Sequence, residues 1–162
     1  RWVAKVYGVS TVYLDNLTLL SASADDERRF LDKLLKEAKE LASQLGVTVH
    51  FLSHLTTPST GKPHEEGGRV EAKQFTGSRA IMRYADFMWG LERDTQAEDP
   101  DIRSTSTFRV VKDRLTGQST GQTFWLRYDP ETSLQEECDA PPENKETSND
   151  KGKCTAAGYG FE

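Results

Sequence analysis

The chain of 162 residues contains little cysteine and no long hydrophobic run. Its two cysteines, Cys138 and Cys154, have no second pair that would complete a metal site, so neither a disulfide scaffold nor zinc is predicted. No apolar stretch approaches the roughly 20 residues that cross a membrane, and no signal peptide is recognisable. We therefore expect no membrane partner and a reduced, cytoplasmic setting. The chain begins with Arg1, and its first methionine is Met82, so we expect translation to begin upstream.

A surplus of positive charge is also absent, which argues against a broad basic platform for nucleic acid. The formal net charge is −5, and residues 129–162 hold nine acids and three lysines, which leaves a charge of +1 on residues 1–128. Large apolar side chains are almost missing from residues 130–158. Such a segment cannot bury enough apolar surface to offset the entropy of ordering. We predict one core domain over residues 1–128 and an acidic, disordered tail over residues 129–162.

Apolar patterning predicts an α/β fold for the first third of the chain. Residues 9–17 and residues 47–53 are β-branched, apolar runs typical of buried parallel strands. Residues 30–45 between them repeat apolar side chains at helical spacing. A strand–helix–strand order implies a right-handed parallel crossover. Asp15 and His54, which end the two strands, should therefore emerge at the same sheet edge.

The second half of the chain is predicted to contain one further strand and a hairpin. Residues 55–75 show no periodicity, and a loop of this length inside a domain is usually functional or mobile. Residues 76–86 suit a short helix, and residues 87–92 suit a third strand. Residues 105–112 and 122–128 flank a glycine-bearing turn and predict an antiparallel hairpin.

Two residues at the strand ends are candidates for a nucleotide site, and each could instead have a purely structural role. Asp15 could hold a hydrated Mg²⁺ in the Walker B arrangement of nucleotide triphosphatases, or it could simply end a strand before a turn. His54 could lie beside a γ-phosphate and report the nucleotide state, or it could be a polar residue that caps its strand. The residues alone leave both alternatives open.

Two groups of cations are the other candidates. Lys112 and Arg114 leave the same face of an extended chain, where they are either solvated edge residues or groups that reach a phosphate across a subunit boundary. Lys62, Arg69 and Lys73 lie in or beside the long loop. They could position the phosphates of a single nucleic-acid strand, or they could be solvated loop residues.

Five motifs in chain order carry a family resemblance, and they are YLDNL at 13–17, FLSHL at 51–55, GKPHEEG at 61–67, TGSRAIMRYAD at 76–86 and VKDRLTG at 111–117. This series closely resembles the C-terminal half of the RecA-like helicase domain of phage primase–helicases, relatives of bacterial DnaB and mitochondrial Twinkle. The likeness covers about residues 1–130. It implies a partial RecA-like core, with a mostly parallel sheet, flanking helices and a C-terminal antiparallel hairpin.

The resemblance also implies a function and residue roles. The family members are ring-shaped, usually hexameric translocases that move on single-stranded DNA and use Mg²⁺ with ATP or another NTP. Asp15 would be the Walker B acid on Mg²⁺, and His54 would be the phosphate sensor. The loop with Lys62 would line the central channel. Arg114 would be the arginine finger and Lys112 its companion, both acting on nucleotide bound by the neighbouring subunit. The acidic tail would contact the replication DNA polymerase.

The sequence departs from this family pattern at two points. No Gly-x-x-x-x-Gly-Lys-Ser/Thr loop occurs, so we expect that the chain alone does not hydrolyse ATP. Arg83 stands where relatives commonly carry a glutamine, and arginine cannot accept a hydrogen bond. Two alternative functions remain. One is a non-enzymatic binding module, a truncated or split-gene product that joins a ring or uses its acidic tail to bind a polymerase. The other is a RecA-like recombinase or clock-type ATPase.

Overall fold

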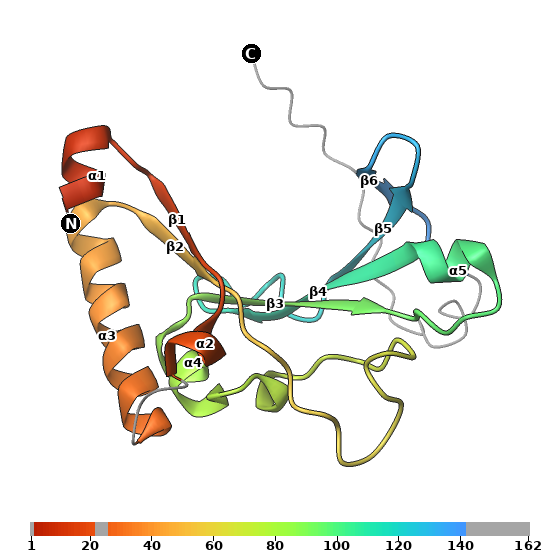
Figure 1. Ribbon diagram of the computed structural model, residues 1–162, viewed down its shortest axis with the longest axis horizontal. Coiled ribbons are helices and arrows are strands. Elements are labelled where there is room, and N and C mark those ends of the chain that lie inside the picture. The colour runs from red at the N-terminus through yellow and green to blue at the C-terminus, as the bar shows by residue number, and fades with distance from the viewer. Residues whose placement is uncertain (1, 22–25, 142–162) are drawn as a thin grey trace.

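The computed structural model describes residues 2–21 and 26–141, and this part of the chain is a mixed α/β structure (Figure 1). Its helices are α1 (Trp2–Tyr7), α2 (Leu17–Ser21), α3 (Glu27–Leu45), the 3₁₀ turn η1 (Ala72–Gln74), α4 (Ser78–Tyr84) and α5 (Pro100–Ser104). Its strands are β1 (Thr11–Leu14), β2 (Thr48–Phe51), β3 (Phe87–Arg93), β4 (Thr105–Asp113), β5 (Thr123–Asp129) and β6 (Leu134–Cys138). The predicted α/β class is confirmed. No helix in the described ranges is long and apolar enough to cross a membrane.

The parallel crossover expected in the first third of the chain is present. β1 and β2 pair in parallel, with Thr11 opposite Thr48 and Leu14 opposite Phe51. α3 connects them, and its N-cap is Asp26, whose Oδ1 accepts a hydrogen bond from the Arg29 N–H at 3.0 Å. Its C-cap is Gly46, which adopts a left-handed conformation with a φ of 64°.

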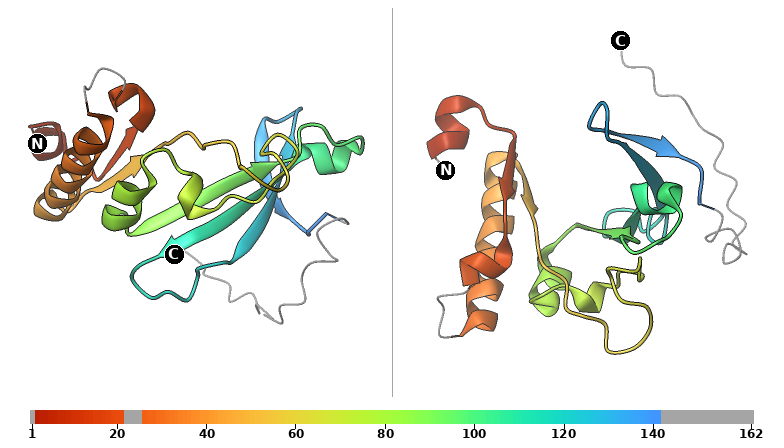
Figure 2. Two further views of the ribbon diagram at one scale, coloured as in Figure 1. Left: turned by 90° about the horizontal axis from the view of Figure 1, so that it is seen from below. Right: turned by 45° about the vertical axis from the view of Figure 1, so that its right-hand side comes forward.

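The two parallel strands are shorter and more exposed than predicted. β1 alternates exposed and half-buried residues, and Tyr13 is 69% exposed. The expectation of a strand buried on both faces is therefore wrong for the described chain. The reason is that α3 packs on one face of the pair, and no second layer of described residues covers the other (Figure 2).

The hydrophobic core lies where α2, α3 and α4 meet the start of β3. Its buried members are Leu17, Leu31, Leu35, Ala80, Ile81 and Met88. Gly77, which precedes α4, must be glycine, because a Cβ there would lie 2.5 Å from the Leu31 Cδ1 and its φ is 77°. This packing attaches α4, and the loop before it, to the parallel pair.

The second sheet is antiparallel, with the strand order β3-β4-β5-β6. It contains the predicted third strand and the predicted hairpin, which is formed by β4 and β5. Parallel pairing among the described residues is limited to β1 and β2, so the antiparallel part is larger than the expected hairpin. β3 was expected in the parallel sheet, but its backbone pairs with β4 in the antiparallel sheet.

β6 lies in the segment that was expected to be disordered. Residues 134–138 pair with β5, and Cys138 stands opposite Trp125. The predicted disorder from residue 129 onward is wrong for this strand. Backbone hydrogen bonds to the edge of β5 order the strand without the apolar burial on which the prediction relied. Residues 142–162, the remainder of the predicted acidic tail, lie outside the described residues.

Candidate functional site at the end of the parallel strands

Asp15 and His54 lie at the same edge of the parallel pair, as the crossover predicts. The strand ends are held together by two backbone hydrogen bonds, from Leu17 N–H to Leu52 O at 2.9 Å and from Leu52 N–H to Leu14 O at 3.0 Å. Both Asp15 and His54 are exposed. In α/β folds this edge, outside the carboxyl ends of the parallel strands, is where ligands bind.

Asn16 connects the two candidates and was missed by sequence reasoning. Its Oδ1 accepts a hydrogen bond from the Leu19 N–H at 2.9 Å, so its amide nitrogen is directed at the His54 Nε2, 3.2 Å away. An amide nitrogen can only donate, which makes Nε2 the acceptor and places the proton of a neutral His54 ring on Nδ1. An asparagine directly before a helix is a typical N-cap, and that signal was available in the sequence.

The edge fits a magnesium ion only in combination with other ligands. Mg²⁺ usually takes one or two protein carboxylates and fills its remaining positions with waters and substrate phosphates. Asp15 supplies one exposed carboxylate. Within residues 2–21 and 26–141, no group of three or more histidine, cysteine or acidic side chains could hold a metal by itself. Asp15 can therefore supply only one of the ligands that such an ion needs.

Lys112 and Arg114 have different environments although they are two residues apart. The Lys112 Nζ donates hydrogen bonds to the carbonyls of Met82 at 2.5 Å and Ala85 at 2.8 Å, which belong to the end of α4. Burial and the nearby Arg114 charge hold the pKa of Lys112 below its usual value. The Arg114 side chain is exposed, while its backbone N–H donates to Asp86 O at 2.8 Å. The Lys112 ammonium group therefore bonds to the end of α4 in the same chain, whereas the Arg114 guanidinium group faces solvent.

The turn that begins with Arg114 is organised by Asp113. The Asp113 carboxylate accepts hydrogen bonds from the backbone N–H groups of Leu115 at 3.0 Å and Thr116 at 3.1 Å, and from the Ser119 hydroxyl at 2.9 Å. The Thr116 hydroxyl donates to it at 2.6 Å. These hydrogen bonds hold the pKa of Asp113 well below its usual range, and the two from Thr116 have the largest effect. Sequence reasoning missed this residue, although an aspartate before a glycine-bearing turn is a known signal.

We expect the contribution of Asp113 to stability to disappear in acid. Its pKa is lower in the folded chain than in the unfolded chain, so its stabilisation is complete above the ordinary aspartate pKa of about 4 and is lost as the pH falls further. The difference in unfolding free energy between the native chain and Asp113→Asn should be constant near neutral pH and shrink below about pH 4. Urea titrations at several pH values measure it, with the exposed Glu98→Gln as the control. A difference that persists unchanged into acid would contradict this assignment.

The three cations expected to contact DNA all lie exposed on the long loop or beside it. Two of them are already paired within the chain. Lys62 Nζ lies 3.1 Å from Asp94 Oδ2, and Lys73 Nζ lies 2.7 Å from Glu71 Oε2. Arg69 forms no ion pair within 4.0 Å among the described residues. The exposed Glu65, Glu66 and Glu71 balance these three positive charges, so the loop carries no net positive charge, and Arg69 acts on Glu71 only through its longer-range charge.

A buried ion pair anchors this loop to the antiparallel sheet, and sequence reasoning missed it. The Arg109 Nε donates to Glu92 Oε1 at 2.6 Å, and a second guanidinium nitrogen donates to Oε2 at 3.0 Å. Oε1 also accepts the Val70 N–H at 2.8 Å. The Glu92 side chain is only 6% exposed. The alternation Met88, Gly90, Glu92 along β3 would have placed this carboxylate on the buried face.

Fold and site together define a mixed α/β segment in which a carboxylate and a histidine follow two parallel strands at the same edge of the pair. Over 131 residues, 80% of its length, the chain is 32% identical to a DNA helicase/primase of Enterobacteria phage T3. This match confirms the predicted resemblance to phage primase–helicases. The chain spans 22% of the length of that relative. No protein-family model matches the chain.

Proposed function

We propose that this chain forms part of a phage replicative helicase, an ATP-dependent ring that translocates on single-stranded DNA. The observation that carries the proposal is the shared edge of Asp15, Asn16 and His54 in a chain that is 32% identical to a helicase/primase. The same match favours a helicase over a recombinase or a clock-type ATPase. Replication of phage DNA in a bacterial host would take place in the cytoplasm.

In this proposal the edge holds a magnesium–nucleotide complex. Asp15 binds Mg²⁺, which supplies Lewis-acid stabilisation of the phosphoryl oxygens when it is bound with ATP or another NTP. His54 senses the terminal phosphate, and Asn16 fixes the orientation and tautomer of its ring. A phosphate-binding loop must come from outside the 162 residues, since none occurs in the sequence.

Arg114 is proposed to act on the nucleotide of a neighbouring subunit. Its exposed guanidinium lies at the start of a turn whose shape is set by Asp113. Lys112 supports this position from within, because it ties the end of α4 to β4. Lys62, Arg69 and the nearby Lys73 are proposed to contact DNA phosphates, and the acidic tail is proposed to bind the replication polymerase.

A chimera tests the proposal as a whole. The matched segment of the phage T3 relative is replaced by the 131 residues of this chain that align with it, and DNA-stimulated ATP hydrolysis and strand separation are measured. We expect both activities to be retained, and we expect Asp15→Asn in the chimera to abolish hydrolysis because the metal loses its carboxylate. Glu98→Gln, at an exposed position away from the edge, is the control. A chimera that assembles but never hydrolyses ATP would overturn the proposal.

The proposed DNA contact can be measured on the chain itself. We expect Lys62→Ala to weaken single-stranded DNA binding and to reduce the slope of log K against log salt by about 0.7, the value for one phosphate contact. Asp94→Asn should strengthen binding by about two- to fivefold, because it releases Lys62 from an exposed ion pair. Lys36→Ala on the exposed surface of α3 is the control. Binding that is insensitive to both loop changes would show that the loop is only solvated.

A further inference from the structure

The turn that carries Arg114 is not anchored by apolar packing. Residues 114–122 connect β4 to β5, and their one large apolar side chain, Leu115, is 72% exposed. Gly117 and Gly121 have φ values of 71° and 91°, which let the chain reverse, and both lie in open space. A connection of this kind must be ordered by hydrogen bonds if it is to hold one shape against the entropy of the chain.

The Asp113 carboxylate supplies most of these hydrogen bonds on the side of the turn that follows Arg114. Its Oδ1 accepts the backbone N–H groups of Leu115 and Thr116 at 3.0 and 3.1 Å. Its Oδ2 accepts the Thr116 hydroxyl at 2.6 Å, and the hydroxyl and N–H of Ser119 at 2.9 and 3.4 Å. Asp113 is 9% exposed. One buried carboxylate therefore fixes the turn on both sides of Gly117.

The same hydrogen bonds keep Asp113 from neutralising the arginine beside it. Adjacent side chains on an extended chain point to opposite faces, and the donors of the turn already occupy both carboxylate oxygens. Among the residues that the structure describes, Arg114 forms no ion pair within 4.0 Å. The charge of the exposed Arg114 guanidinium therefore stays available to a group outside this chain.

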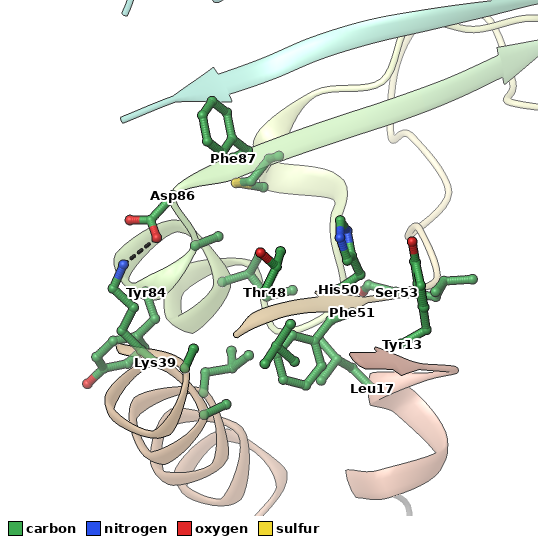
Figure 3. A pocket seen from close by; sticks show the side chains of 18 of the residues that line it. Tyr13, Leu17, Lys39, Thr48, His50, Phe51, Ser53, Tyr84, Asp86 and Phe87 are labelled. Carbon is green, nitrogen blue, oxygen red and sulfur yellow. Dashed lines mark hydrogen bonds and ion pairs between the residues drawn. The ribbon is translucent and has the colours of Figure 1, made fainter. Parts of the chain in front are cut away.

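The backbone of Arg114 is held from the other side by Asp86. The Arg114 N–H donates to the Asp86 carbonyl at 2.8 Å. Asp86 directly precedes β3 and lines a cavity of about 750 Å³ between α3, β2 and β3, where its carboxylate is paired with Lys39 (Figure 3). Arg114 thus leaves the chain between two supports, the Asp86 carbonyl and the turn that Asp113 orders.

We propose that Asp113 is a positioning residue for phosphoryl transfer, which orients the Arg114 guanidinium toward a nucleotide bound by the neighbouring subunit. The inference rests on the proposed function, in which Arg114 acts across the subunit boundary. A catalytic group is effective only while its geometry is held, and a misplacement of about 1 Å can cost about 100-fold in rate. Asp113 itself touches no nucleotide, because its oxygens are occupied within the chain.

The kinetics of ATP hydrolysis by the T3 chimera test this role. We expect Asp113→Ala to lower kcat by about 10- to 100-fold, with KM for ATP and affinity for single-stranded DNA changed by less than about twofold. Asp113→Asn should keep kcat within about threefold of the parent, because its amide oxygen still accepts both backbone N–H groups. The control is Asp99→Ala, which removes the carboxylate that accepts the Asp101 N–H at the start of α5 and should leave kcat unchanged.

Mixed assemblies separate positioning from a general loss of structure. Asp113→Ala subunits should recover part of the activity when mixed with Asp15→Asn subunits, because some interfaces then combine an intact Asp15 with a correctly held Arg114. Mixed with Arg114→Ala subunits they should recover nothing, since every interface lacks either the arginine or its support. In the chain alone, without nucleotide, Asp113→Ala should speed amide exchange at Leu115 and Thr116 by at least about tenfold.

Four results would overturn the positioning role: an unchanged kcat in Asp113→Ala, a change in KM alone, an equal loss of kcat in Asp99→Ala, or no recovery with Asp15→Asn subunits. If Asp113→Ala does not assemble, Thr116→Val combined with Ser119→Ala removes both hydroxyl donors and should lower kcat by about three- to tenfold. An unchanged kcat in that double variant would also overturn the role.

The Arg114→Ala chimera distinguishes this inference from the proposed function. If Arg114→Ala loses activity while Asp113→Ala keeps it, only the positioning role of Asp113 is wrong. If Arg114→Ala hydrolyses ATP as fast as the parent chimera, the proposed function of Arg114 is wrong, and the positioning role is overturned with it.

Discussion

Replacing Arg114 by alanine is expected to slow nucleotide hydrolysis by the assembled helicase by about 10³- to 10⁵-fold, the usual effect of losing an arginine finger. The side chain is exposed, and its backbone is held in place by the Asp86 carbonyl and the Asp113 turn. A planar guanidinium at such a position can stabilise charge on a phosphoryl group of the neighbouring subunit. Single-stranded DNA binding should be unchanged, because among the described residues no hydrogen bond links this turn to the long loop.

Mixed assemblies give this prediction a sharper form. Chimeric subunits with Arg114→Ala and chimeric subunits with Asp15→Asn should each be inactive alone. Together they should recover part of the activity, because some interfaces then combine an intact Asp15 with an intact Arg114. Arg79→Ala, an exposed arginine on α4, is the control and should retain full activity. Absence of any recovery in the mixture would contradict an action across the subunit boundary.

Replacing Glu92 by glutamine is expected to lower the free energy of unfolding by about 3 kcal/mol. The change removes the charge that compensates Arg109, whose side chain is only 17% exposed, and leaves a buried cation without a counter-ion. It also weakens the acceptor for the Val70 N–H, so the base of the long loop should loosen. Urea unfolding followed by tryptophan fluorescence measures the loss, and the exchange rate of the Val70 amide measures the loosening.

The companion variants separate charge loss from general disruption. Glu40→Gln, at an exposed position on α3, should change stability by less than about 0.5 kcal/mol. The double variant Glu92→Met with Arg109→Met should be more stable than Glu92→Gln, because no unpaired charge remains buried. A Glu92→Gln chain as stable as the native one would show that the pair does not support the loop.

Local patterns predicted much of the fold and the first candidate site. The apolar period of α3, with glycine at its end, and the two β-branched runs were enough to imply a parallel crossover. A crossover brings the ends of its strands to one edge, which is why Asp15 and His54 could be placed together. The hairpin of β4 and β5 followed in the same way from alternation around a glycine-bearing turn.

By itself, then, the sequence determined the order and type of the elements, the edge that carries Asp15 and His54, and the resemblance to phage primase–helicases. Tertiary structure alone decided which groups meet across long stretches of chain. It paired Glu92 with Arg109, turned Lys112 back onto α4, and ordered β6 on the edge of β5. It also left the edges of β2 and β3 unpaired around a cavity. The physical reason is that periodicity records which face of an element is apolar, whereas partners and free edges depend on how separate elements pack in three dimensions.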